Sequence, residues 1–178
     1  MNENEFSRPV RLDSLGAGER TVAIAAEPAE RDALARRFGL VAIDRLEAET
    51  HLSRDGAIVR LRGTLTAEVT QSCVATGESL PAALSDAFTL RFLPAEQAPA
   101  DGAEEIGLTE EDCDTLFYEG GAVDIGEAVA ETMILALDPF PRSPDADAVL
   151  RAAGVLQEGE TGPFAALKAL KRPPKDEG

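Results

Sequence analysis

Residues 57–78 read AIVRLRGTLTAEVTQSCVATGE, and this stretch decides the fold of the chain. Apolar or small side chains occupy every second position from Val59 to Val69, and polar or charged side chains occupy the positions between them. Successive side chains of a β-strand point to opposite faces of a sheet, so the alternation predicts a strand with one buried and one exposed face. The strand is predicted to end in a tight turn that begins at Cys73 and contains a glycine.

The neighbouring segments are predicted to pair with this strand. Residues 40–53 show an extended pattern whose parity shifts by one near Asp44, which indicates a β-bulge. The Asp-Gly pair at 55–56 lies between two alternating runs and is typical of a hairpin turn. A third alternating run covers residues 84–92, so we predict a three-stranded antiparallel meander over residues 40–93. One parity of the third run carries Leu84, Asp86, Phe88, Leu90 and Phe92.

Two short strands and a helix are predicted before the meander. Phe6–Leu12 and Arg20–Ala25 have extended patterns and are expected to form a hairpin with a loose connection. Pro28 suits the first turn of a helix over Ala29–Phe38, and Gly39 suits the left-handed residue that ends one. This helix is expected to cover one face of the sheet.

The chain after the meander is predicted to begin with an insertion. Residues 94–112 are acidic and contain proline and glycine, which predicts a mobile loop. Thr115–Glu119 has strand composition. Asp124 is followed three positions later by Glu127, a capping-box spacing that opens a helix, and this helix must stop before the prolines that follow Asp138.

Together these elements predict an α+β fold, with an antiparallel β-sheet or partly open barrel of about six to seven strands and three to four packed helices. A further short helix is expected over Asp145–Ala153. Residues 1–156 are expected to form a single domain with the acidic loop inserted in it. Residues 157–178 are expected to comprise a linker, a short helix over 163–171 and a basic tail.

The composition restricts the classes of partner. The 178 residues carry a formal net charge of −16, and an acidic chain repels phosphate unless its cations gather in one patch. Seven Phe, one Tyr and no Trp leave few rings on which nucleic-acid bases could stack. Direct nucleic-acid binding must therefore be local or shared with a basic partner.

The cysteine count and the hydropathy pattern indicate a reduced, cytoplasmic protein. A disulfide between Cys73 and Cys113 is conceivable, but the first residues lack the apolar stretch of a secretory signal. No run of about 18 apolar residues occurs, which argues against a membrane span. Two cysteines and one histidine cannot by themselves supply the four ligands of a structural zinc site. We therefore expect no cofactor, no membrane and no small-molecule substrate.

Three stretches resemble the YceD family of bacterial and plastid proteins, which is linked to the accumulation of large-subunit ribosomal RNA. They are CVATGE at 73–78, VDIGEAVAETMILALDPFPR at 123–142, and PFAALKALK at 163–171, and the middle stretch is the most specific. The resemblance implies a role in 23S ribosomal RNA processing or large-subunit assembly, with no established enzymatic activity. The positions that carry it are Cys73, Gly77, Asp124, Glu127, Glu131, Pro139, Pro163, Phe164 and Leu167.

Members of this family often carry a second cysteine in the turn, three positions after the first, and this pair has been associated with metal binding. Thr76 stands at that position in this chain. A hydroxyl group is a poor ligand for a soft divalent ion, so we expect no metal here.

Two interpretations stay open for the basic side chains. Arg60 and Arg62 share the exposed face of the central strand with Arg91 across the hairpin, and they are either an RNA-contacting stripe or ordinary solvated charges. The tail residues either contact phosphate or favour a helix C-terminus. The segment 138–142 is either a rigid exit from the helix or a recognition segment. The candidate contacts are Arg60, Arg62, Arg91, Arg142, Lys168, Lys171 and Arg172.

The remaining polar candidates fit the scaffold better than a reactive site. Cys73 is interpreted as a small structural residue at a turn, and His51 lacks an oriented partner for catalysis. Asp124, Glu127 and Glu131 either stabilise the start of their helix or form an acidic face for a basic ribosomal protein.

The sequence therefore predicts a non-enzymatic factor that acts through ribosomal RNA or a large-subunit ribosomal protein. A metal- or thiol-dependent enzyme using Cys73, and a protein-binding adaptor without RNA contact, are the alternatives.

Overall fold

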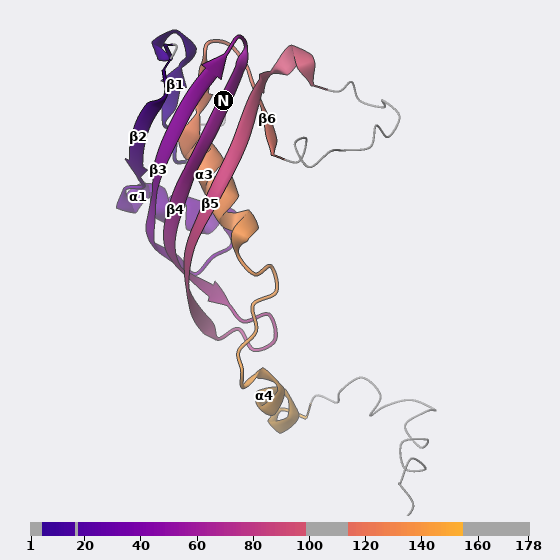
Figure 1. Ribbon diagram of the computed structural model, residues 1–178. Coiled ribbons are helices and arrows are strands. Elements are labelled where there is room, and N and C mark those ends of the chain that lie inside the picture. Colours follow the sequence, from indigo (N-terminus) through magenta and orange to yellow (C-terminus); the bar gives the residue numbers. More distant parts are fainter. Residues whose placement is uncertain (1–4, 17, 99–113, 155–178) are drawn as a thin grey trace, which may run out of the picture.

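A five-stranded sheet in the order β2-β3-β4-β5-β6 forms the body of the molecule in the computed structural model, which describes residues 5–16, 18–98 and 114–154 (Figure 1). Strands β2 to β5 are antiparallel, and β6 runs parallel to β5. The sheet is open within this part of the chain, with β2 and β6 at its edges. Its strands are β2 (Arg20–Ala25), β3 (Ala42–Asp55), β4 (Ile58–Ser72), β5 (Ser79–Pro94) and β6 (Thr115–Tyr118).

A second sheet of two short strands and three helices complete the described part of the chain, so the predicted α+β class is confirmed. The short strands β1 and β7 pair antiparallel. Two single 3₁₀ turns, η1 and η2, follow β1 and β5. The elements are β1 (Pro9–Arg11), η1 (Leu12–Ser14), α1 (Pro28–Phe38), η2 (Ala95–Gln97), β7 (Ala122–Asp124), α3 (Ile125–Ala136) and α4 (Ala146–Ala152).

The predicted meander is confirmed as strands β3, β4 and β5. The register of β3 on β4 shifts between Ile43 and Arg45, where the sequence predicts a bulge. At the hairpin, Asp55 pairs with Ile58, so Gly56 is the first of two turn residues, and its φ is 60°. A positive φ at that position matches the right-handed twist of the two strands, and glycine adopts it without steric cost.

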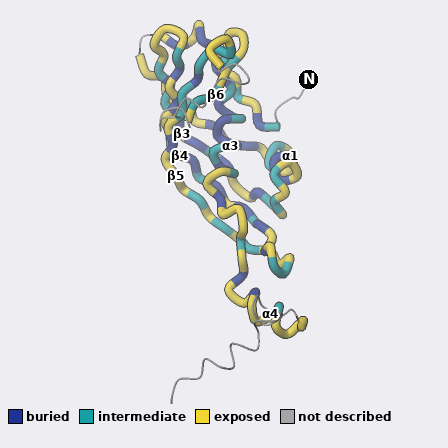
Figure 2. Tube along the Cα trace, turned by 90° about the vertical axis from the view of Figure 1, so that its right-hand side faces the viewer, coloured by how far each residue is buried: buried dark blue, intermediate teal, exposed yellow. Residues whose placement is uncertain are grey.

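The core lies between one face of this sheet and the helices α1 and α3 (Figure 2). Strand β4 has the burial pattern iBeBeieBiBeBiBe, which follows the predicted alternation. Gly63 interrupts the row of large side chains because a Cβ there would lie 2.4 Å from the carbonyl oxygen of Glu49. The fully buried residues that meet in the core include Leu61, Leu65, Val59, Leu52, Leu34, Val129 and Met133.

The predicted hairpin between the first two strands is wrong. Strand β1 pairs with β7, with Val10 opposite Val123, whereas β2 pairs with β3. The connection between β1 and β2 buries Leu12 and Leu15 in the core, so it does not form a tight reversal that would bring the two strands together. Strand β7 was not predicted, because three residues are too few to show an alternating pattern.

The helices begin and end close to the predicted residues. Helix α1 starts at Pro28, carries a capping box at its N-terminus and is followed by Gly39 with a φ of 67°. Helix α3 begins after Asp124, which caps it, and ends before the prolines. The expected reciprocal bond from Glu127 is absent from the described contacts, since the Glu127 side chain pairs with Arg37 instead. Helix α4 confirms the short helix predicted over 145–153.

Several predictions fall on residues outside the described ranges. They concern most of the acidic loop (99–112), the linker at 157–162, the terminal helix at 163–171, and Cys113. Of the predicted loop, Pro94 ends β5 and residues 95–97 form η2. In the described ranges, we find no helix with the length and apolar character required to span a membrane.

Candidate functional site

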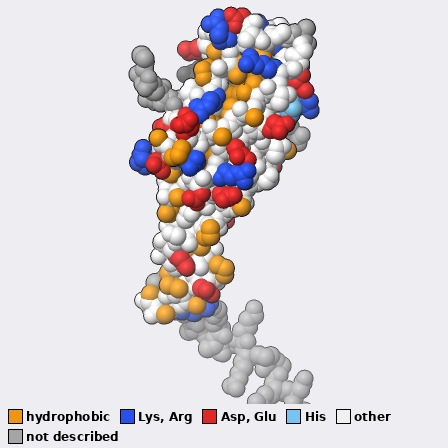
Figure 3. Space-filling model, turned by 90° about the vertical axis from the view of Figure 1, so that its left-hand side faces the viewer, with side chains coloured by type: hydrophobic (Ala, Val, Ile, Leu, Met, Phe, Trp, Pro, Cys, Tyr) orange, Lys and Arg blue, Asp and Glu red, His pale blue; other side chains and the backbone are white. Residues whose placement is uncertain are grey.

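The arginines predicted to contact RNA are for the most part already bonded to neighbours. Arg62 makes three hydrogen bonds to the carboxylate of Glu19, the shortest of 2.8 Å. Arg142 pairs with Asp147, at the start of α4. Figure 3 shows the same mixture on one side of the molecule, where blue and red side chains lie next to one another. Arg62 and Arg142 are thus each paired with a carboxylate of the chain itself.

The other two described arginines lie opposite each other in the sheet. Arg60 on β4 is in register with Arg91 on β5, as expected for a shared face. Arg60 is exposed and makes no ion pair with a described residue, whereas Arg91 is half-buried and donates a hydrogen bond of 3.3 Å to Thr115. Lys168, Lys171 and Arg172 lie outside the described residues.

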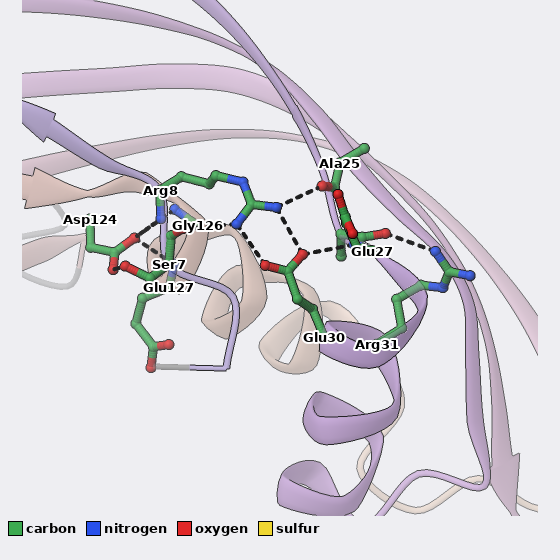
Figure 4. Close-up of polar contacts among 10 residues, drawn as sticks. Ser7, Arg8, Ala25, Glu27, Glu30, Arg31, Asp124, Gly126 and Glu127 are labelled. Carbon is green, nitrogen blue, oxygen red and sulfur yellow. Dashed lines mark hydrogen bonds and ion pairs between the residues drawn. The ribbon is translucent and has the colours of Figure 1, made fainter. Parts of the chain in front are cut away.

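Asp124 ties the N-terminal segment to the start of α3 (Figure 4). Its Oδ1 accepts hydrogen bonds from the backbone N–H groups of Arg8, Gly126 and Glu127, at 2.8, 3.1 and 3.3 Å. Its Oδ2 accepts one from the Ser7 hydroxyl at 2.6 Å. These contacts satisfy N–H groups that a helix start leaves without an intrahelical partner. Asp124 is thus a structural residue in this arrangement.

Arg8 extends this network to α1 (Figure 4). Its two terminal nitrogens donate to the two carboxylate oxygens of Glu30 at 2.7 and 2.8 Å, and one of them also donates to the carbonyl of Ala25. The Arg8 guanidinium is the main reason that the pKa of Glu30 lies below its ordinary value. Glu30 in turn accepts the backbone N–H of Glu27, so one side chain serves both the helix cap and the N-terminal segment.

The two other carboxylates of the predicted acidic face differ in their surroundings. Glu127 binds Arg37 through both carboxylate oxygens, at 2.6 and 3.0 Å. Glu131, one turn later, is half-buried, and burial together with the negative charge of Glu127 raises its pKa. Glu127 is therefore neutralised within the fold, while Glu131 remains available at the edge of a groove.

Two motif segments that are far apart in the sequence meet at the end of β4. The Val74 N–H donates to the Pro141 carbonyl at 2.9 Å, and the Ser143 N–H lies 3.3 Å from the sulfur of Cys73. Gln71 also donates from its side chain to the Asp138 carbonyl at 2.8 Å. The segment after α3 is thereby fixed to the turn after β4, in agreement with its interpretation as a rigid exit.

The thiol of Cys73 lies in an unusual environment. The residue is 2% exposed, and hydrogen bonds from the Ser143 N–H and the Thr76 hydroxyl lower its pKa to about 7. Such donors stabilise the thiolate form.

His51 cannot serve this thiol as a base. It lies opposite Arg62 in the sheet, and Cys73 follows the far end of the same strand, β4. At about 3.3 Å per residue, the eleven residues from Arg62 to Cys73 correspond to about 36 Å. The His51 ring instead contacts the Thr21 hydroxyl at 3.1 Å. No group of three or more His, Cys, Asp or Glu side chains within the described ranges is placed to hold a metal ion.

A groove between β5 and α3 was not predicted from the sequence. It has a volume of about 370 Å³, and Phe88, Leu90, Leu116 and Leu135 contribute its apolar surface. Leu135 is 84% exposed. Three acidic residues, Asp86, Asp114 and Glu131, also line it. Two signals were present in the sequence: Asp86 on the apolar parity of its strand, and Leu135 outside the apolar stripe of its helix.

Comparison with models of known protein families gives a match to this chain. A family model described as "Large ribosomal RNA subunit accumulation protein YceD" matches residues 61–171, a span that begins in β4 and includes the groove, the Cys73 turn and α3. No curated protein and no solved structure matches the chain.

Proposed function

The chain belongs to the YceD family of large ribosomal RNA subunit accumulation proteins, and we propose on this basis that it promotes the accumulation of large-subunit ribosomal RNA as a non-enzymatic factor. The family match, which covers more than half of the chain, is the observation that carries this proposal.

We further propose that the chain acts by binding a basic protein of the large subunit. Its net charge of −16 attracts such a protein and repels the RNA backbone. Binding of phosphate by Arg62 or Arg142 would compete with the carboxylates of Glu19 and Asp147. These pairs favour protein over RNA as the direct partner.

The surroundings of Cys73 support a structural role for this thiol. It is buried in a turn, and His51 is bonded elsewhere on the sheet. A nucleophilic cysteine needs access to its substrate and a partner that activates it, and the described residues around Cys73 provide hydrogen-bond donors alone.

Removal of the gene tests the cellular role. We expect large-subunit ribosomal RNA to fall relative to small-subunit RNA, and an intact copy of the gene to restore the ratio. The Cys73→Ala variant should also restore it, because the proposal assigns no reaction to the thiol. An unchanged ratio in the deletion strain would contradict the proposed function.

Crosslinking in cells distinguishes the two kinds of direct partner. We expect crosslinks to large-subunit proteins that survive nuclease treatment. If ribosomal RNA were the direct partner, ultraviolet crosslinks to RNA would dominate and would decrease in an Arg60→Ala variant but not in a control variant, Arg36→Ala, whose residue is exposed on α1.

A further inference from the structure

Strand β5 has a long free edge within the described part of the chain. Strand β6 pairs with β5 from Arg91 to Pro94, and no described strand pairs with the outer edge from Ser79 to Leu90 (Figure 1). A strand edge of this kind presents a row of backbone N–H and C=O groups to which another extended segment can bind.

The hydrogen bonds fix which residues of β5 face outward. The Arg91 N–H donates to the Asp114 carbonyl at 2.8 Å, so Arg91 points its backbone groups toward the β6 side. Backbone groups of alternate residues point to the same side of a strand, and the outward set therefore includes Ala83, Ser85, Ala87 and Thr89. Pro81 belongs to the same set, and its missing N–H ends the row at a position where no sheet bond is lost.

The groove lies directly beside this edge and suits alternate side chains of an added strand. Ala87 and Thr89 of the edge are themselves among its lining residues. An added strand would direct every second side chain into the groove, where Leu135 of α3 and Leu116 of β6 offer apolar contact. An edge that offers backbone pairing beside an apolar groove is the usual arrangement for strand addition.

The charges of the groove select the chemistry of the added segment. Asp86, Asp114 and Glu131 line it, and no lysine or arginine is among its lining residues in the described ranges. A segment with lysine or arginine would neutralise these carboxylates. A second copy of the chain would instead bring a second acidic groove to the same edge, and residues 99–112 carry six carboxylates without a lysine or arginine.

We propose that the free edge of β5 and its groove bind an extended basic segment of a partner protein as an added strand. This inference rests on the proposed function, because it names the surface that would bind the basic large-subunit protein. Charged residues and prolines, such as Asp86 and Pro81, also protect edge strands from unwanted pairing. In this proposal they exclude apolar strands while Asp86 attracts a cationic one.

A short synthetic peptide in which lysine alternates with valine serves as the probe, with the full-length protein. Binding is measured by fluorescence anisotropy, and amide hydrogen exchange locates it. We expect the amides of Ser85, Ala87 and Thr89 to gain protection, while the amides of β2 at the opposite edge do not. A peptide in which glutamate replaces lysine should not bind.

Charge variants test the groove without touching the core. The double substitution Asp86→Asn and Glu131→Gln should weaken binding of the lysine peptide about tenfold at low salt, because it removes two of the three carboxylates. Asp32→Asn, on the exposed surface of α1, is the matched control and should leave binding unchanged. Peptides methylated on every second backbone nitrogen test the pairing. Alternate N–H groups of an added strand point to opposite sides, so methylation of the set that faces β5 should abolish binding, whereas methylation of the other set should not.

Several results would overturn the inference. They are absence of binding, protection at other strands, equal binding by both methylated peptides, or equal affinity of the charge variant. Protection of the edge amides in the free protein would show that the chain itself or a second copy occupies the edge. A charge variant that fully restores ribosomal RNA in the deletion strain would remove this surface from the function, whereas a deletion without effect on ribosomal RNA would refute the proposed function itself.

Discussion

Cys73 is a buried residue whose pKa is set by the hydrogen bonds that its sulfur accepts. Because Ser143 and Thr76 donate hydrogen bonds to its sulfur, its pKa is lowered to about 7. A lowered pKa stabilises the folded state above the pKa of the unfolded thiol, and this contribution is lost as the pH falls through about 7. The thiol therefore reports on the contact between the turn and the segment after α3.

Replacement of Thr76 by valine tests this explanation. Valine is close in volume to threonine but lacks the hydroxyl that donates to the sulfur. The pKa of Cys73 should therefore rise from about 7 toward its ordinary value. Ultraviolet absorbance of the thiolate across a pH titration measures the shift, in a Cys113→Ser background so that one thiol titrates. Thr70→Val, on β4, should leave the titration unchanged. If the pKa of Cys73 were the same in the Thr76 variant as in the wild type, the Thr76 hydroxyl would not donate a hydrogen bond to the sulfur.

Glu131 gives a prediction of the opposite sign. Its pKa is raised by burial and by Glu127, so its charged form destabilises the folded state at neutral pH. Glu131→Gln should therefore increase the free energy of unfolding at pH 7, by about 0.5 kcal/mol because the site is partly exposed. The gain should disappear below the ordinary pKa of glutamate, where the wild-type side chain is neutral in both states. Urea unfolding at several pH values measures it, and a gain that persists at low pH would contradict the assignment to charge.

At the scale of elements, Gly126 decides how closely the N-terminal segment approaches α3. A Cβ at this position would lie 2.3 Å from the carbonyl oxygen of Phe6 and 3.0 Å from the backbone nitrogen of Arg8. Both neighbours are backbone atoms, so relief requires the segment before β1 to move. In the same segment the Arg8 N–H donates a hydrogen bond to Asp124, and the chain then continues into β1, which pairs with β7.

We expect Gly126→Ala to lower the free energy of unfolding by about 2–3 kcal/mol, although alanine has the higher helix propensity. Denaturant unfolding measures the loss, and hydrogen exchange should show lower protection in β1. Gly121→Ala is the matched control, because a Cβ there meets no atom within 4 Å. Equal stability of the two variants would mean that the N-terminal segment adapts without cost.

The elements that could be predicted from the sequence are those whose pattern is local. Alternation over residues 59–70 identifies a strand, the Asp-Gly pair identifies its hairpin, and the capping residues identify two helices. The pairing of β1 with β7 could not be predicted, because Val10 and Val123 lie in short strands far apart in the sequence. The groove depends on how far α3 covers β5, and in the sequence it is marked only by Asp86 and Leu135, which depart from the local patterns of their strand and helix.

The roles of the candidate residues could likewise be predicted only where they depend on a local pattern. Asp124 was recognised as a helix cap because capping is local, whereas the ion pairs of Arg62 and Glu127 join segments distant in the sequence. Such pairs decide whether a charge is free for a partner. The sequence therefore predicted where the basic and acidic side chains lie, but it did not predict which of them are already paired within the fold.

At the scale of the whole molecule, the charged side chains also join the separate parts of the helical layer. Arg37 at the end of α1 binds Glu127 in α3 and Glu5 in the N-terminal segment. These contacts connect three segments on the covered side of the sheet. Each carboxylate raises the pKa of the Arg37 guanidinium, with Glu127 the larger contributor.

Arg37 therefore allows a test of whether this layer is held together by charge. In a double-mutant cycle, Arg37→Ala and Glu127→Gln should show a coupling energy of about 1 kcal/mol, reduced by the partial exposure of Arg37. Hydrogen exchange in the Arg37 variant should increase in both α1 and the first turn of α3. Arg36→Ala, on the exposed surface of the same helix, should leave unfolding within about 0.5 kcal/mol of wild type. Zero coupling would mean that burial of apolar residues such as Leu34 and Val129 in the core holds the two helices in place without help from the ion pair.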